Sequence, residues 1–134
     1  GREIKSHGRT FDAVLADVPC TGIGALRRRP EVRWRRTVKD LAPLLTLQAE
    51  LVEAALSVLN PAGYFGYATC SPHFAETTGQ VREILKRHPE LTQIDPTPYL
   101  PAGLEGATRE GALSLWGHQH GTDSMFLAIF QKTA

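Results

Sequence analysis

Two cysteines and an aspartate are the residues of this sequence best suited to covalent chemistry. Cys20 closely follows Asp17, and Cys70 lies between a threonine and a serine. A thiolate is a strong nucleophile, but a free thiol, with a pKa of about 8.5, is mostly protonated at neutral pH. The carboxyl group of Asp17 can accept hydrogen bonds from a ligand or, when protonated, donate one.

Each of these residues follows a predicted strand. Residues 11–16 and 64–69 are largely apolar runs, typical of strands buried on both faces of a parallel sheet. Loops that contain proline or glycine follow both runs. The carboxyl ends of adjacent parallel strands share one rim, where ligands bind. We therefore expect Asp17, Cys20 and Cys70 to come together on that rim.

Several readings compete for the two thiols. A helix predicted just after Cys70 would favour its thiolate through backbone N–H groups and the helix dipole. A single cysteine is nevertheless more often a buried core residue than a catalytic one. A zinc site with His73 lacks a Cys-x-x-Cys spacing, and a redox pair lacks its usual local motif. His118 and His120 fit a surface loop better than a ligand set, so we expect no metal.

The remaining elements predict an α/β domain. One helix should begin at the N-cap Asp40 and end at the stop signals of residues 60–63, and a second should run from about residue 75 to 88. Their inward faces are apolar: Leu41, Leu44, Leu45, Leu51, Val52, Ala55 and Leu59 in the first, and Val81, Ile84 and Leu85 in the second. The order continues with a weak strand at residues 91–94 and a loop rich in Pro and Gly at residues 95–111. It ends with a short edge strand at residues 113–116 and a strong final strand at residues 124–130. This order predicts a largely parallel sheet.

A basic segment, residues 27–39, concentrates the positive charge of the chain. Its cations are Arg27, Arg28, Arg29, Arg33, Arg35, Arg36 and Lys39, against the single anion Glu31, although the formal net charge of the chain is only +1. Such a patch on an otherwise acidic body is the pattern expected for a phosphate-rich partner. The alternative is a solvated loop whose arginines pair with nearby carboxylates, and charge alone leaves the two readings even.

Length and composition exclude several classes of protein. With 134 residues the chain makes one domain, and 42% hydrophobic residues are ordinary for a globular protein. No apolar run approaches the roughly 20 residues of a membrane span, so we expect no membrane partner. The first nine residues lack the apolar stretch of a signal peptide. Two cysteines make no disulfide framework, which favours the reducing cytoplasm.

The motifs around the two cysteines resemble one enzyme family. Residues 17–34, Asp-Val-Pro-Cys-Thr-Gly with an arginine-rich extension, and residues 67–71, Tyr-Ala-Thr-Cys-Ser, are similar to the two cysteine motifs of the Nop/Sun-type RNA (cytosine-5) methyltransferases. Residues 47–48 and 121–128 also fit, and the likeness is greatest to the bacterial ribosomal small-subunit methyltransferase B branch. One motif departs, because Phe-Ala-Glu-Thr stands at residues 74–77 in place of Pro-Glu-Glu-Asn.

The resemblance implies a reaction that uses both thiols. Cys70 would attack carbon 6 of a cytosine, carbon 5 would take a methyl group from S-adenosylmethionine, and Cys20 would assist release. Asp17 would lie at the cofactor and the cytosine, and Pro19 at the cofactor. The basic segment would hold RNA phosphates, with 16S ribosomal RNA as the expected substrate, while Trp34 either stacks on a base or packs its loop. DNA cytosine methyltransferases attack with the cysteine of a Pro-Cys motif, which leaves Cys20 open as the nucleophile.

The resemblance also implies that the chain is part of a domain. The Gly-rich cofactor half of the family lacks a counterpart before residue 11, so we expect residues 1–134 to be the C-terminal half of a Rossmann-like methyltransferase domain. Such a half has a mostly parallel sheet with an antiparallel final strand. It should bind cofactor weakly or not at all, and its open sheet edge could pair two copies into a homodimer. The alternative function is a non-catalytic RNA-binding or assembly module.

Overall fold

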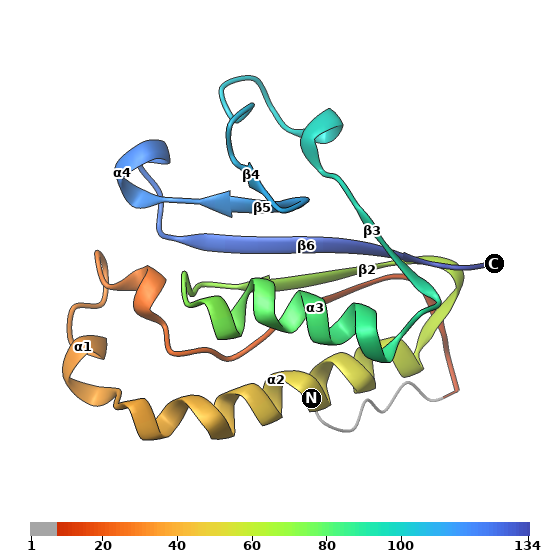
Figure 1. The fold of residues 1–134 in the computed structure, drawn as a ribbon, viewed down its shortest axis with the longest axis horizontal. Helices are drawn as coiled ribbons and strands as arrows, with labels where there is room; N and C mark the ends of the chain where they lie inside the picture. The colour runs from red at the N-terminus through yellow and green to blue at the C-terminus, as the bar shows by residue number, and fades with distance from the viewer. Residues whose placement is uncertain (1–7) are drawn as a thin grey trace.

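The computed structural model describes residues 8–134, which form one six-stranded sheet with its two long helices on one face (Figure 1). The opening residues 1–7, on which the expectation about a signal peptide rests, lie outside the described residues. The strands are β1 Phe11–Asp17, β2 Leu59–Thr69, β3 Leu91–Ile94, β4 Thr108–Arg109, β5 Ala112–Leu115 and β6 Met125–Lys132. The α-helices are α1 Val32–Arg35, α2 Leu41–Ser57, α3 Thr78–Arg87 and α4 Gly117–His120.

The sheet is mixed, with the order β1-β2-β6-β5-β4 and β3 paired to β6 as well. The antiparallel final strand is confirmed, since β6 runs antiparallel to β2, β3 and β5. Most strands run in one direction, as expected, but among the described residues only β1 and β2 pair directly in parallel. The reason is the position of β6. Strands β1, β2, β3 and β5 share one direction, but β6 separates β2 from the other two.

Strand β1 lies at an open edge of the sheet. It pairs with β2, and within residues 8–134 no strand pairs with its other side. We expected a strand buried on both faces, but Leu15 is 67% exposed and Phe11 42%. Helices cover one face of the sheet only, so residues on its second face, such as Tyr64, also stay open to solvent.

Helix α2 begins where the sequence predicts and ends earlier. Asp40 precedes it, but the Asp40 carboxylate accepts the backbone N–H of Thr37 at 2.6 Å and closes the preceding turn. This hydrogen bond lowers the pKa of Asp40. The helix ends at Ser57 because β2 starts at Leu59, which is therefore a strand residue. Residues 60–63 belong to β2 rather than to a helix stop.

The core lies between the sheet and helices α2 and α3. It contains Val52, Ala55 and Leu56 of α2, Val81 and Ile84 of α3, Phe65 and Tyr67 of β2, and Phe126, Ala128 and Phe130 of β6. The rings of Phe65 and Phe130 stack with centroids 5.8 Å apart. Each of the larger aliphatic and phenylalanine side chains among them contributes about 1.5–3 kcal/mol by leaving water. This packing fixes the position of β2, and hence of the loop beyond Thr69.

The remaining elements confirm most of the sequence reading. Leu85 lies half-buried beside Val81 and Ile84, as its helical spacing predicts, although α3 begins at Thr78 rather than near residue 75. Strand β5 was expected at an edge, but it lies between β4 and β6 because the long loop before it supplies the short strand β4. No helix within residues 8–134 is long and apolar enough to cross a membrane.

Candidate active site

The two thiols meet at the carboxyl ends of β1 and β2. The Sγ atoms of Cys20 and Cys70 lie 3.2 Å apart, and both cysteines are free. The loops that carry them follow adjacent parallel strands, so the expected meeting on one rim is confirmed. The sulfur atoms are close enough to share a proton, and one small electrophilic group could contact both.

The two cysteines differ in exposure. Cys20 is buried at 7% exposure, whereas Cys70 is half-buried, and the Sγ of Cys20 also accepts the N–H of Gly22 at 3.3 Å. Burial, followed by the hydrogen bond to Cys20 and its charge, raises the pKa of Cys70 to about 12. The expectation that a helix start lowers this pKa is wrong, because α3 begins only at Thr78, beyond a separate 3-10 turn.

Gly24 joins the first cysteine loop to the second. Its N–H donates to the carbonyl oxygen of Cys70 at 3.0 Å, and its own carbonyl oxygen accepts the N–H of Ser124 at 2.9 Å. A Cβ atom at this position would lie 2.5 Å from the Cys70 oxygen and 2.4 Å from the Ser124 oxygen. Only glycine allows three segments to approach so closely.

A buried carboxylate holds both cysteine loops. Glu76, in the 3-10 turn Phe74–Glu76, is fully buried. Its Oε1 accepts the N–H of Thr21 at 2.9 Å, and its Oε2 accepts the Thr21 hydroxyl at 2.7 Å. The hydroxyl of Ser71 also donates to Oε2. Thr21 follows Cys20 and Ser71 follows Cys70, so one side chain fixes the spacing of the two thiols.

Gln48 extends this network to the helices. It is fully buried on α2, and its Nε2 donates to Glu76 at 3.1 Å and to the carbonyl oxygen of Pro19 at 3.0 Å. Its Oε1 accepts from Gln80 of α3 at 3.2 Å. The Tyr67 hydroxyl donates to the carbonyl oxygen of Glu76 at 2.6 Å, and burial raises the pKa of this phenol. Sequence reasoning missed Glu76 as a site residue and used Gln48 only as part of a motif.

Asp17 and Pro19 lie on the exposed side of the same rim. Asp17 ends β1 and is exposed, and its carboxylate has no hydrogen bond within residues 8–134. Its charge is near enough to contribute to the raised pKa of Cys70. A carboxylate at the carboxyl end of a parallel strand can accept hydrogen bonds from the N–H or O–H groups of a ligand. Pro19 is also exposed, and Gln48 fixes its carbonyl group.

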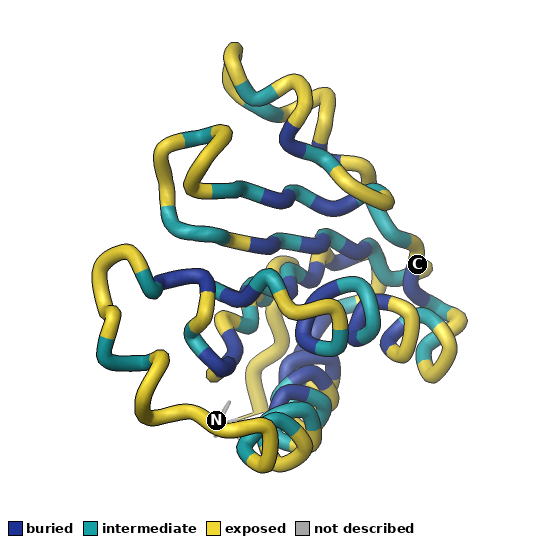
Figure 2. Tube along the Cα trace, turned by 60° about the vertical axis from the view of Figure 1, so that its left-hand side comes forward, coloured by how far each residue is buried: buried dark blue, intermediate teal, exposed yellow. Residues whose placement is uncertain are grey.

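The basic segment is exposed but partly paired (Figure 2). Arg27 donates to the carbonyl oxygen of Gly121 at 2.7 Å. The Nε of Arg28 donates to Asp123 at 2.6 Å, and this hydrogen bond raises the pKa of the guanidinium. Arg29 lies 3.6 Å from Glu31. Salt bridges with carboxylates therefore account for two of the seven cations, and Arg36 lies close enough to Asp40 to interact with its charge. Within the described residues no acidic partner is found for Arg33, Arg35 and Lys39.

Trp34 does not pack its loop. Its side chain is 81% exposed, and its closest described partner is the guanidinium of Arg33, 5.3 Å from the ring centroid. The open ring face is available for stacking.

The histidines considered as metal ligands have other partners. The Nδ1 of His73 accepts the N–H of Ala75 at 3.1 Å, and the Nδ1 of His120 accepts the N–H of Trp116 at 2.9 Å. Both rings therefore cap local turns. In the part of the chain that the structure describes, no three His, Cys, Asp or Glu residues gather in a way that could hold a metal ion.

Comparisons with known proteins agree with this arrangement. The Mycobacterium tuberculosis protein Rv1407 is 50% identical over 122 residues, which cover 91% of this chain and 26% of that protein. Ribosomal RNA small subunit methyltransferase B of Xylella fastidiosa is 40% identical over 127 residues, 93% of this chain and 28% of that protein. The chain thus spans about a quarter of the length of these curated relatives.

Solved structures confirm the fold class. The crystal structure of PH0851 matches with a TM-score of 0.85 and 32% identity, over 97% of this chain and 29% of that one. A methyltransferase homolog protein from Pyrococcus horikoshii matches with a TM-score of 0.71 and 26% identity, over 94% of this chain and 40% of that one. The described residues are thus a partial Rossmann-like methyltransferase domain. The model of the family described as 16S rRNA methyltransferase RsmB/F matches residues 1–131, and the chain, with its two cysteine motifs on one rim, belongs to that family.

Proposed function

We propose that this chain is the C-terminal half of the catalytic domain of a cytoplasmic RNA (cytosine-5) methyltransferase that acts on 16S ribosomal RNA. The observation that carries the proposal is the 3.2 Å separation of the Cys20 and Cys70 sulfur atoms at the ends of adjacent parallel strands. A reaction in which one thiol adds to a ring and a second group helps to eliminate it needs such a pair. Family membership supports the same reaction class.

The chemistry requires a covalent adduct, because carbon 5 of cytosine is a poor nucleophile. A thiolate forms a bond to carbon 6, and the ring electrons shift to give an enamine whose carbon 5 can accept a methyl group. S-adenosylmethionine supplies that group when it is bound. Removal of the proton from carbon 5 then drives β-elimination, which breaks the bond between sulfur and carbon 6 and frees the enzyme.

Cys70 is proposed as the attacking residue and Cys20 as the residue that assists elimination. The greater exposure of Cys70 supports this assignment, since the nucleophile must reach a bound base. The pKa of about 12 means that Cys70 carries its proton at rest and must lose it as substrate binds. Cys20 and Asp17 are the neighbours that influence this pKa, so they are the groups placed to receive or relay the proton.

Other residues are proposed to bind. Asp17 would hydrogen-bond the cytosine ring and the cofactor, and Pro19 would contact the cofactor. The basic segment would hold phosphates of RNA from which the target base is flipped out. The open edge of β1 would pair with the strands of the cofactor-binding half, with a homodimer through that edge as the alternative.

The test uses the complete enzyme with its cofactor-binding half, S-adenosylmethionine and 16S ribosomal RNA. Cys20→Ala should accumulate an RNA–protein adduct that survives denaturing electrophoresis, because attack proceeds and release fails. Cys70→Ala should abolish both adduct and methylation, and the double variant should behave like Cys70→Ala. An adduct in Cys70→Ala alone would assign the attack to Cys20. Methylation that persists in both single variants would overturn the proposal.

A non-catalytic RNA-binding module is the second candidate. The neutral resting thiol of Cys70 and the exposed cations of the basic segment favour it. Such a module would bind RNA equally well after either cysteine substitution. It would lose affinity and salt dependence when Arg27, Arg28 and Arg29 are neutralised together.

A further inference from the structure

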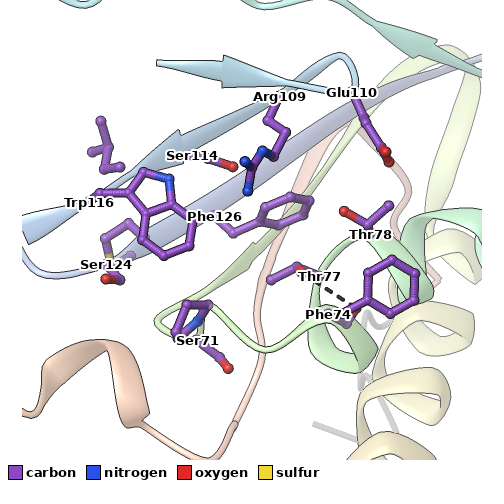
Figure 3. Close-up of a pocket in the computed structure, with 13 residues that line it drawn as sticks. Ser71, Phe74, Thr77, Thr78, Arg109, Glu110, Ser114, Trp116, Ser124 and Phe126 are labelled. Atoms are coloured by element: carbon purple, nitrogen blue, oxygen red, sulfur yellow. Dashed lines mark hydrogen bonds between the residues drawn. The ribbon is translucent and has the colours of Figure 1, made fainter. Parts of the chain in front are cut away.

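A cavity of about 370 Å³ opens directly beside the Cys70 loop (Figure 3). Ser71 and Pro72, the residues that follow Cys70, form one side of it. Trp116 stands on another side and Phe74 on the opposite one, while Phe126 of β6 lies between them. The mechanism proposed above uses none of the aromatic residues in this cavity.

The rings in the cavity are accompanied by arginines. The guanidinium of Arg109 lies 5.9 Å from the ring centroid of Trp116, and that of Arg82 lies 5.4 Å from the ring centroid of Phe74. Arg82 is also 3.5 Å from Glu110, so part of its charge is compensated. Arg109 has no carboxylate partner within residues 8–134 and is exposed at the mouth of the cavity.

Unpaired hydroxyl groups complete the lining. The side chains of Thr78, Ser114 and Ser124 line the cavity, and none has a hydrogen-bond partner among the described residues. Ser114 is 9% exposed, and because Thr69 alone among the described residues has a fully buried side-chain polar atom without a partner, the Ser114 hydroxyl is reached by solvent from the cavity. A ligand with an aromatic ring and polar edges could stack on the aromatic side chains and form hydrogen bonds with the hydroxyl groups at the same time.

The backbone ties this cavity to the cysteine loops. The N–H of Ser124 donates to Gly24, and the N–H of Gly24 donates to Cys70, so the far wall of the cavity and the thiol pair belong to one hydrogen-bonded unit. When the target base lies at Cys70, the adjacent nucleotide of the RNA strand would therefore lie close to the mouth of the cavity.

We propose that this cavity takes the base of an unpaired nucleotide adjacent to the target cytosine in the substrate RNA. The base stacks between Trp116 and Phe74, its edges meet the free hydroxyl groups, and its phosphate lies against Arg109. Unpaired RNA bases are recognised by such stacking on aromatic side chains and arginine planes. The inference rests on the proposed function and deepens it, because it assigns sequence context to this part of the enzyme.

The test is a coupling experiment on the complete enzyme with short RNA substrates. Each neighbour of the target cytosine is replaced in turn by an abasic nucleotide. At one position the replacement should lower kcat/KM of the wild-type enzyme by ~5- to 150-fold, the range for stacking one base on an aromatic ring. In Trp116→Ala the same replacement should cost about twofold or less, because the stacking is already lost.

The control is Tyr99→Ala, which removes another exposed ring that does not line the cavity and should leave the abasic effects unchanged. Phe74→Ala alters an exposed side chain and keeps the test valid if Trp116→Ala fails to fold. Coupling absent from both ring variants at every RNA position would overturn the inference. The same coupling is also measured from the affinity for RNA. If the coupling is present but the enzyme does not methylate RNA, the result contradicts the proposed function and leaves the proposed base pocket standing.

Discussion

Glu76 accepts both the backbone N–H and the hydroxyl of Thr21, at 2.9 and 2.7 Å. The carboxylate lies in the turn beyond the second cysteine loop, while Thr21 belongs to the first. With Ser71 and Gln48 also donating to it, Glu76 receives four hydrogen bonds and is fully buried. The separation of the two thiols therefore depends on a residue that takes no part in the proposed covalent chemistry.

Replacing Glu76 with glutamine should destabilise the protein by roughly 2–3 kcal/mol, because an amide cannot accept at both ends and leaves a buried donor unpaired. The free energy of unfolding is measured by urea denaturation. Glu83→Gln is the control: Glu83 is exposed on α3 and should change stability by less than about 0.5 kcal/mol. Equal stability of the two variants would contradict the role given to Glu76.

The sequence was sufficient to predict which loops meet. Apolar runs ahead of Cys20 and Cys70 indicated two strands, and the rule for carboxyl ends of parallel strands brought the thiols to one rim. The position of β6 between β2 and β3 was not readable, because strand order depends on contacts between distant segments. The exposure of Leu15 was missed because an apolar run predicts a buried strand, and the run itself does not show whether another element covers each face.

The supporting residues were harder to predict than the thiols. Glu76 lies where the helix was expected to have begun, and a glutamate there reads as solvent-exposed. Its burial follows only from the donors around it, which come from three separate segments. The Gly22-x-Gly24 spacing was too common to interpret, yet the close approach of Gly24 to Cys70 explains the second glycine. Residues 74–77 depart from the family motif and still retain the buried acid.

Gly24→Ala should disturb the active site by steric conflict. The added Cβ would meet two backbone oxygens at 2.4 and 2.5 Å, so the Cys70 loop must shift. Overpacking of this kind lowers the free energy of unfolding by about 1–3 kcal/mol. The rate of methylation should fall even under conditions where the variant stays folded, because the two thiols move apart. Gly106→Ala is the matched control, because nothing lies within 4 Å of its Cβ position. If Gly24→Ala methylates RNA at the wild-type rate, the close approach of the two loops at Gly24 is not required for activity.

The reactivity of Cys70 should rise with pH well beyond neutrality. Because burial and Cys20 raise its pKa to about 12, only the thiol form is abundant at neutral pH. Alkylation by iodoacetamide, followed at Cys70 by mass spectrometry, should increase about tenfold per pH unit from pH 7 to 10. Free cysteine, measured alongside, should level off above its ordinary pKa of about 8.5. A plateau for Cys70 below pH 9 would contradict the raised pKa.

Removing Cys20 should make Cys70 more reactive. The hydrogen bond to Cys20 and the charge on it both raise the pKa of Cys70, so Cys20→Ala lowers that pKa and speeds alkylation at pH 8. Cys20→Ser keeps a hydrogen-bonding group without an ionisable thiol and should fall between the wild-type protein and Cys20→Ala. An unchanged rate in Cys20→Ala would leave burial and the charge of Asp17 as the causes of the raised pKa.

The arginines of the basic segment should contribute unequally to RNA binding, because Asp123 already pairs with Arg28. Arg35→Gln should reduce the slope of log affinity against log salt by about 0.7–0.9 if Arg35 contacts a phosphate, whereas Arg28→Gln should change it less. Asp123→Asn frees Arg28 and should steepen the slope, while Glu83→Gln, which removes one charge elsewhere, controls for net charge. Equal slopes for Arg28→Gln and Arg35→Gln would mean that RNA displaces Asp123. In that case the Arg28–Asp123 pair breaks on binding, while Arg27 still holds the carbonyl oxygen of Gly121.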